Sequence, residues 1–145
     1  MNFNKILIAF FVTLTISIIS CSSDDENPVN EYPKTVNIKF EITTSNNPEA
    51  TVTTTINNDS NSEEISGFPY SQAFTQQEIN IGSYLKLTLE DMSDCPVISD
   101  PQNPGTNNCD YTAELSILID EEVIKTESFE LTTGVGTVLI DYTVE

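Results

Sequence analysis

Residues 35–44 read TVNIKFEITT, and apolar and polar side chains alternate along the whole stretch. The apolar members of this stretch are Val36, Ile38, Phe40 and Ile42. A period of two residues is typical of a β-strand with one buried face, because successive side chains point to opposite sides of a sheet. The stretch therefore predicts a strand whose sheet has one buried side and one solvated side.

The same alternation recurs along the rest of the chain. It is found at residues 50–57, 79–91, 111–120, 123–131 and 137–144. These runs predict about seven strands with turn signals every 8 to 12 residues or so, a spacing typical of a β-sandwich. No stretch has a convincing helical period. We therefore expect an all-β domain over residues 35–145.

Several connections follow from the same pattern. The polar cluster at 45–49 predicts a turn that joins the first two runs into a hairpin. The residues 58–64, NDSNSEE, are expected to form a loop before a short strand at Ile65. Pro69 cannot donate a hydrogen bond to a sheet, so it predicts a bend or the start of an edge strand, with Phe74 pointing inward.

The N-terminal segment has the features of an export signal. Lys5 supplies a positive charge, an apolar run covers residues 6–19, and Ser20 is small. The run is shorter than the 20 or so apolar residues that a membrane-spanning helix needs. Its end, Ile-Ile-Ser before Cys21, resembles the bacterial lipobox, which implies removal of residues 1–20 and acylation of Cys21. The alternative is an ordinary signal peptide with a chance cysteine.

The residues after Cys21 are polar and acidic. Residues 21–34 begin CSSDDE and contain almost no apolar side chain, so we expect a flexible tether. This start resembles surface lipoproteins of the Bacteroidetes, which implies a lipid anchor on the outer face of the outer membrane. The alternative is a solvated spacer on a lipoprotein that faces the periplasm.

The negative net charge of the chain excludes some classes of binding partner. The chain has 23 acidic and 5 basic residues, a net charge of −18, and without Lys5 the mature chain carries −19. A nucleic-acid partner is not expected, because phosphates require a basic surface. Adsorption of the acidic chain to anionic lipid is disfavoured as well, so the acyl group on Cys21 would supply the membrane contact. The partner is expected to be an unknown envelope protein or a glycan.

The other two cysteines form an even pair. If Cys21 is acylated, Cys95 and Cys109 are expected to form a disulfide in an oxidising compartment. Such a bridge would close a loop rich in Pro, Asn and Asp and restrict the unfolded chain by about 3 kcal/mol in the chain-entropy view. A redox or metal pair fits less well, because the spacing is not C-x-x-C and the chain has no histidine.

Four segments together resemble one known domain family. PYSQAF at residues 69–74 resembles the P-W-S-x-x-F element of the MmpS-like domain, with Tyr70 in place of Trp. Residues 82–91, 115–129 and 134–144 resemble its later strands, with Glu121 where Gly is common. The resemblance implies an immunoglobulin-like antiparallel β-sandwich. It also implies a membrane-tethered partner of lipid or siderophore transporters, the role of MmpS proteins in mycobacteria.

Catalysis is not expected. The chain has no histidine to act as a base near neutral pH, and most of its acids fall in turns or on the polar faces of strands. Hydrolysis by two carboxylates needs both acids at a fixed separation in a cleft. The acids near the end of the 79–91 run are interpreted as a solvated cluster.

Oxygen ligands suggest a weak calcium alternative. Four aspartates surround the cysteine loop: Asp91, Asp94, Asp100 and Asp110. Calcium takes six to eight oxygen ligands or so from flexible loops, although no EF-hand spacing is present. A second acidic group, residues 120–122, lies at a predicted hairpin tip. The alternative function is therefore a calcium-dependent adhesion or glycan-binding domain. The competing interpretation of the same acids is an acidic surface without a specific calcium site.

Two features are candidates for contact with a partner. Phe68 and Tyr70 lie in a Gly- and Pro-containing segment and would form an aromatic contact if they were exposed. Packing in the core or against an edge strand is the favoured interpretation for both rings. The loop between Cys95 and Cys109 is the most individual part of the sequence and the first candidate for a partner surface.

Overall fold

The computed structural model describes residues 32–93, 110–132 and 136–145, which fold into one unit. All of its regular elements are strands. They are β1 (Lys34–Thr44), β2 (Ala50–Ile56), β3 (Asp59–Ile65), β4 (Tyr70–Ile79), β5 (Tyr84–Asp91), β6 (Tyr111–Ile119), β7 (Glu122–Leu131) and β8 (Thr137–Thr143). The predicted signal and residues 21–31 of the predicted tether lie outside the described residues. The last part of the tether prediction is wrong, because Tyr32 packs against the core and Lys34 already begins β1.

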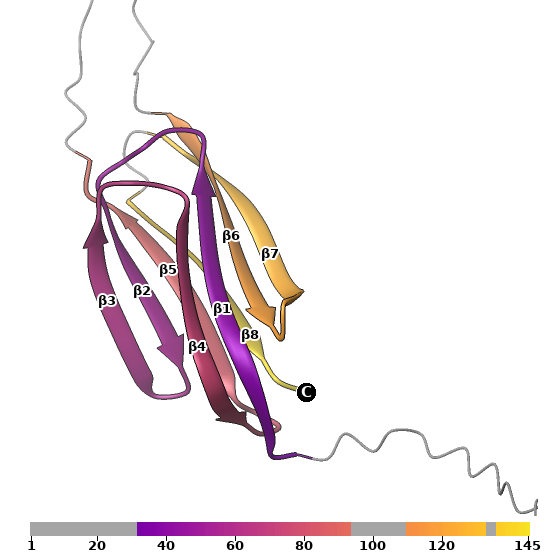
Figure 1. Ribbon diagram of the computed structural model, residues 1–145. Coiled ribbons are helices and arrows are strands. Elements are labelled where there is room, and N and C mark those ends of the chain that lie inside the picture. The colour runs from indigo at the N-terminus through magenta and orange to yellow at the C-terminus, as the bar shows by residue number, and fades with distance from the viewer. Residues whose placement is uncertain (1–31, 94–109, 133–135) are drawn as a thin grey trace, which may run out of the picture. The chain divides into compact units, whose positions relative to one another are not determined.

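The strands form two antiparallel four-stranded sheets that face each other (Figure 1). One sheet has the order β4-β1-β6-β7, and the other has the order β3-β2-β5-β8. The predicted β-sandwich is confirmed, with eight strands in place of about seven. β4 and β3 are edge strands, one in each sheet, and the chain crosses from β3 to β4 at the same side of the sandwich.

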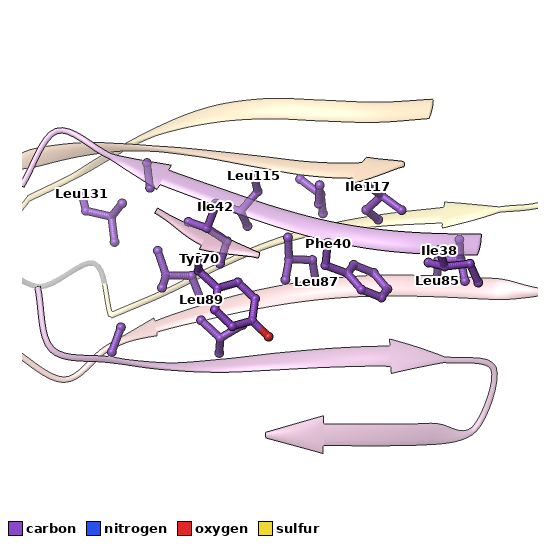
Figure 2. Packing of buried hydrophobic residues seen from close by; sticks show 14 of the residues in the cluster. Ile38, Phe40, Ile42, Tyr70, Leu85, Leu87, Leu89, Leu115, Ile117 and Leu131 are labelled. Atoms are coloured by element: carbon purple, nitrogen blue, oxygen red, sulfur yellow. The ribbon is translucent and has the colours of Figure 1, made fainter. Parts of the chain in front are cut away.

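The core is built from the alternating side chains that the sequence predicts. The inward residues of β1, β5 and β6 are buried, and Phe40 on β1 meets Phe74 on β4 edge to face at 5.9 Å between ring centroids. Figure 2 shows side chains of the two sheets interdigitating in one cluster. Burial of this kind is the main favourable contribution to folding.

Two sequence-based predictions of pairing are wrong. β1 and β2 do not form a hairpin: β1 pairs with β4 and β6, whereas β2 pairs with β3 and β5 in the other sheet. The segment 58–64 is not a loop, because Asp59–Ile65 forms β3 and pairs along its whole length with β2. The real hairpin turn is Asn57–Asn58, where Asn57 takes a φ of 55°.

The edge strand β4 agrees with the prediction from Pro69. The strand begins at Tyr70, directly after that proline, and Phe74 packs against the core. A bulge interrupts β4, and Gln76 takes a φ of 54° there. Asn37 on β1 holds this bulge, because its side-chain Oδ1 accepts a hydrogen bond from the backbone N–H of Gln76 at 3.2 Å.

The turn between β6 and β7 is a tight two-residue turn. Asp120 and Glu121 have φ values of 48° and 69°, so both occupy the left-handed region that glycine and asparagine favour. Asp120 compensates in part, since its Oδ1 accepts a hydrogen bond from the backbone N–H of Asn37 at 2.8 Å. This contact fixes the turn against the start of β1.

Candidate functional site at the loop-bearing end

Four strands end at the same end of the sandwich. They are β1, β3, β5 and β7, and the predicted cysteine loop follows β5 in the sequence (Figure 1). β1 enters from the other end, where the β6–β7 turn and the C-terminus also lie. The domain therefore separates the entry of the N-terminal segment from its main group of loops.

Backbone hydrogen bonds join Glu49, Asp91, Met92 and Gly136 at this end, and we call these residues the loop base. The N–H of Asp91 donates to the carbonyl of Gly136 at 2.7 Å, and the N–H of Met92 donates to the carbonyl of Glu49 at 2.8 Å. Segments that lie far apart in the sequence are thereby held side by side. Asp91, Met92 and Ser93 thus leave β5 from a fixed position.

Asp91 of the loop base lies next to Tyr111. The Tyr111 side chain is buried, and its burial, followed by the nearby Asp91 carboxylate, raises the pKa of the Tyr111 phenol above its ordinary value. Asp91 also accepts a hydrogen bond from the Ser93 N–H at 2.8 Å. The Tyr111 hydroxyl lies near this carboxylate, and among the described residues it has no partner at hydrogen-bonding distance and angle.

The structure places two of the four predicted calcium ligands. Asp91 ends β5, and Asp110 is exposed directly before β6, whereas Asp94 and Asp100 lie outside the described residues. Within residues 32–93, 110–132 and 136–145, no three acidic, histidine or cysteine side chains come together closely enough to hold a metal ion. One oxygen of Asp91 is already engaged by Ser93. A calcium site stays a prediction that involves the cysteine loop.

The three cysteines also lie outside the described residues. Acylation of Cys21 and a disulfide between Cys95 and Cys109 therefore stay predictions. The strands on either side of the loop end at Asp91 and begin at Tyr111, next to each other in space. A bridge between the two cysteines would close the loop that connects these two strands.

The two aromatic candidates differ in exposure. Tyr70 is only 7% exposed and lies in the core cluster, with its hydroxyl at the edge of the cluster (Figure 2). That hydroxyl donates to the Gln72 Oε1 at 2.8 Å. Phe68 is half-buried against the core, and its N–H donates to the Asn47 Oδ1 at 3.3 Å. Core packing thus accounts for Tyr70, and Phe68 retains an exposed part.

A hollow beside Met92 lies at the same end of the sandwich. It has a volume of about 430 Å³ and is lined by Glu49, Ala50, Glu64, Ile65, Ser66 and Met92. Met92 is among the most exposed large apolar side chains of the described residues. An exposed thioether next to two carboxylates suits a ligand that has both an apolar and a cationic part.

Comparison with known protein families, with curated proteins and with solved structures gives no match to this chain. Among the residues that the structure describes, no helix is long and apolar enough to cross a bilayer.

Sequence reasoning missed a second candidate surface, the groove between β3 and β4. The sequence predicts a loop on its β3 side, because DSNSEEI has one apolar residue and no hydrophobic alternation. One signal was present: an Asn-Asn pair between two runs rich in Ser and Thr is typical of a hairpin turn. Recognition of that turn would have placed the acids of residues 59–64 on an edge strand.

Proposed function

We propose that this chain is a non-catalytic, lipid-anchored envelope protein whose β-sandwich acts as an interaction or accessory module. The observation that supports this proposal best is the separation of the two ends of the domain. The N-terminal segment enters at Lys34, and the loops that follow β1 and β3 lie at the far end (Figure 1). The residues that line the hollow beside Met92 come from the same end. An anchor at Cys21 would direct these loops away from the membrane.

The length of β1 and the length of the chain between Cys21 and Lys34 support this orientation. β1 has 11 residues, and at about 3.4 Å per residue it separates the two ends by roughly 35 Å. Lys34 is 13 positions after Cys21, so the chain from one to the other spans at most about 45 Å when extended, at about 3.5 Å per residue. The loop end would therefore reach several tens of ångströms from the lipid surface, a distance suited to contact with another envelope component.

A transporter-associated role is the specific form of this proposal. It is supported by the resemblance of residues 69–74, 82–91, 115–129 and 134–144 to the MmpS-like domain. The fold alone does not determine a function, since β-sandwiches serve many. The strong negative charge of the chain also favours an acyl anchor as the membrane contact, because anionic head groups would repel the protein surface.

The test begins with the anchor. The full-length chain and a Cys21→Ser variant are expressed in a bacterium that has an outer membrane, and the products are separated into membrane and soluble fractions. We expect the unaltered chain in the outer-membrane fraction, with acyl mass on Cys21 by mass spectrometry, and the variant in the soluble fraction or retaining residues 1–20.

Two further measurements address orientation and partner. Protease added to intact cells should remove the domain if it faces outward and should leave it intact if it faces the periplasm. Crosslinking in intact cells should capture an envelope protein through a photoreactive residue at Met92, and not through one at Glu122 beside the opposite turn. An unmodified Cys21 in the membrane fraction would overturn the anchor, and equal capture at both positions would overturn the assignment of the loop end.

A further inference from the structure

The sandwich is open along the side where β3 and β4 lie. A groove with a volume of about 440 Å³ runs between these two edge strands, one from each sheet. Its apolar surface comes from Ile56 on β2 and Phe74 on β4, both partly buried against the core. Beside it, the buried hydroxyl of Thr54 donates to the Gln72 Oε1 at 2.9 Å and ties the two sheets together.

The inner face of β3 is acidic where an apolar face is expected. Asp59 pairs with Ile56 and Glu63 pairs with Val52, so both acids lie on the face of the sheet that elsewhere forms the core. Asp59 lines the groove together with Glu78 of β4. Farther along, Glu63 lies beside Tyr70 and contributes, after burial, to raising the pKa of that tyrosine.

No positive charge in the neighbouring sequence offsets these acids. The chain has no lysine or arginine between Lys39 and Lys86, a segment that contains β2, β3 and β4. Two of the four lysines after residue 20 are within ion-pair distance of a glutamate on their own strand: Lys39 with Glu41 and Lys125 with Glu127. The strands β2, β3 and β4 around the groove therefore contain acids and no basic residue, over an apolar floor.

The backbone of β3 is available at the same place. In the described sheet β3 pairs with β2 alone, so its other edge has unpaired N–H and C=O groups. The hydroxyls of Thr53 and Ser62 lie 2.7 Å apart, which is typical of the closely spaced pairs whose backbone groups point away from the partner strand. Ser62 therefore directs its N–H and C=O toward the open edge.

We propose that this edge binds an extended, lysine- or arginine-rich segment of another polypeptide, which adds to β3 as a further strand. Main-chain hydrogen bonds to β3 would supply affinity, and side chains at alternate positions would supply selectivity. On a strand, side chains two residues apart share a face. A bound segment with a cationic residue at every second position places one beside Asp59 and another beside Glu63, while its remaining side chains face solvent.

The charge of the edge selects this occupant over two others. A second copy of the chain pairing β3 with β3 would bring Asp59 and Glu63 against the same acids, and like charges in adjacent strands are destabilising. The chain's own residues 21–34 begin CSSDDE and are repelled for the same reason. Inward charges also protect an edge from unspecific pairing with apolar strands, and a cationic strand is the partner that they do not exclude.

This inference rests on the proposed interaction role and adds to it a partner class and a surface separate from the loop end. The test uses the full-length chain in detergent and two fluorescent peptides of identical composition at about 0.15 M salt, where long-range attraction is screened. One peptide alternates Lys and Thr over eight residues, and the other has four Lys followed by four Thr. Only the alternating peptide places lysines four residues apart on one face, as Asp59 and Glu63 are.

We expect the alternating peptide to bind at least tenfold more tightly by fluorescence anisotropy. The double variant Asp59→Asn with Glu63→Gln should remove this preference. The matched control, Glu114→Gln with Glu130→Gln, removes two exposed acids from β6 and β7 and should retain it. Both variants change exposed side chains, and an unchanged thermal melting curve verifies that each is folded.

A backbone variant separates strand addition from charge attraction. Ser62→Pro removes one outward N–H at an edge position where proline is tolerated, and it should weaken the alternating peptide while leaving the four-lysine block peptide unchanged. Hydrogen exchange should show new protection within β3 when the alternating peptide binds.

Equal affinity for the two peptides, or equal loss in the β3 double variant and in its control, would show unspecific attraction and overturn the inference. Neither result bears on acylation of Cys21 or on crosslinking at Met92, so the inference and the proposed function fail separately.

Discussion

Strands β1 and β3 are both regular strands, but different interactions hold them in place. β1 lies between β4 and β6, and its inward residues Ile38, Phe40 and Ile42 are completely buried. β3 pairs on one side, and all of its residues except Ile65 are exposed. Burial therefore stabilises β1, whereas pairing with β2 and the Asn57–Asn58 turn define β3. The two strands should respond differently to substitution.

The largest expected effect is at the centre of β1. Phe40→Ala removes a fully buried ring and its edge-to-face contact with Phe74, and it leaves a cavity between the sheets. A substitution of this kind costs about 3–5 kcal/mol. Urea unfolding followed by circular dichroism should show this loss in the free energy of unfolding with little change in the denaturant slope. A loss below about 1 kcal/mol would contradict the core that the structure assigns to β1.

A smaller effect on stability is expected at high pH from two tyrosines, Tyr70 beside Glu63 of β3 and Tyr111 beside Asp91. Tyr70 and Tyr111 are nearly buried, and burial followed by Glu63 or Asp91 raises the pKa of each phenol above the ordinary tyrosine pKa of about 10. The folded state therefore retains these protons at a pH where the unfolded state has lost them. Stability should be unaffected below pH 10 and should fall above it, by at most about 1.4 kcal/mol per pH unit for each tyrosine.

The measurement is a series of urea unfolding curves between pH 8 and 11. Tyr70→Phe and Tyr111→Phe should each flatten the decline above pH 10. A decline of the same slope in both variants and in the unaltered chain would assign it to general repulsion among the acids.

The difference between β1 and β3 also explains what the sequence predicts well. Alternation at Leu85, Leu87 and Leu89, and again at Tyr111 to Ile117, correctly identifies inward faces, because a half-buried strand requires this period. The pattern does not specify which strand pairs with which. The turn at 45–49 therefore suggests a hairpin, whereas the chain crosses to the other sheet there, and β3 has no apolar period to detect.

The candidate site is predictable to a lesser degree. The acids at the end of β5 and the individual character of the following loop are visible in the sequence, and the structure brings Asp91 next to Tyr111. The contact of Met92 with Glu49 joins two segments of different strands, and no local pattern indicates it. The groove depends on β3 and β4 lying at the same side of two different sheets. Such neighbours follow from topology alone.

A modest gain is expected at the turn that joins β6, a central strand, to β7. Burial of β6 keeps this turn in place although Glu121 has a φ of 69°. Glu121→Gly should relieve this conformation and raise the free energy of unfolding by about 1 kcal/mol. Glu122→Gly, which removes the same charge within β7, should lower it. A loss in the first variant would show that the turn is not strained.

The smallest effect is expected on β3 itself. Ser62→Ala removes a hydroxyl that lies 2.7 Å from the Thr53 hydroxyl on the exposed face of the sheet, and both groups can bond to water instead. The free energy of unfolding should change by no more than about 0.5 kcal/mol, as for other exposed substitutions. Urea curves measured beside those of Phe40→Ala provide the comparison within one fold. A loss above about 1 kcal/mol would mean that β3 contributes to global stability through its side chains. Its polar sequence would then be a structural requirement, and the strand would be less free to serve as a binding edge.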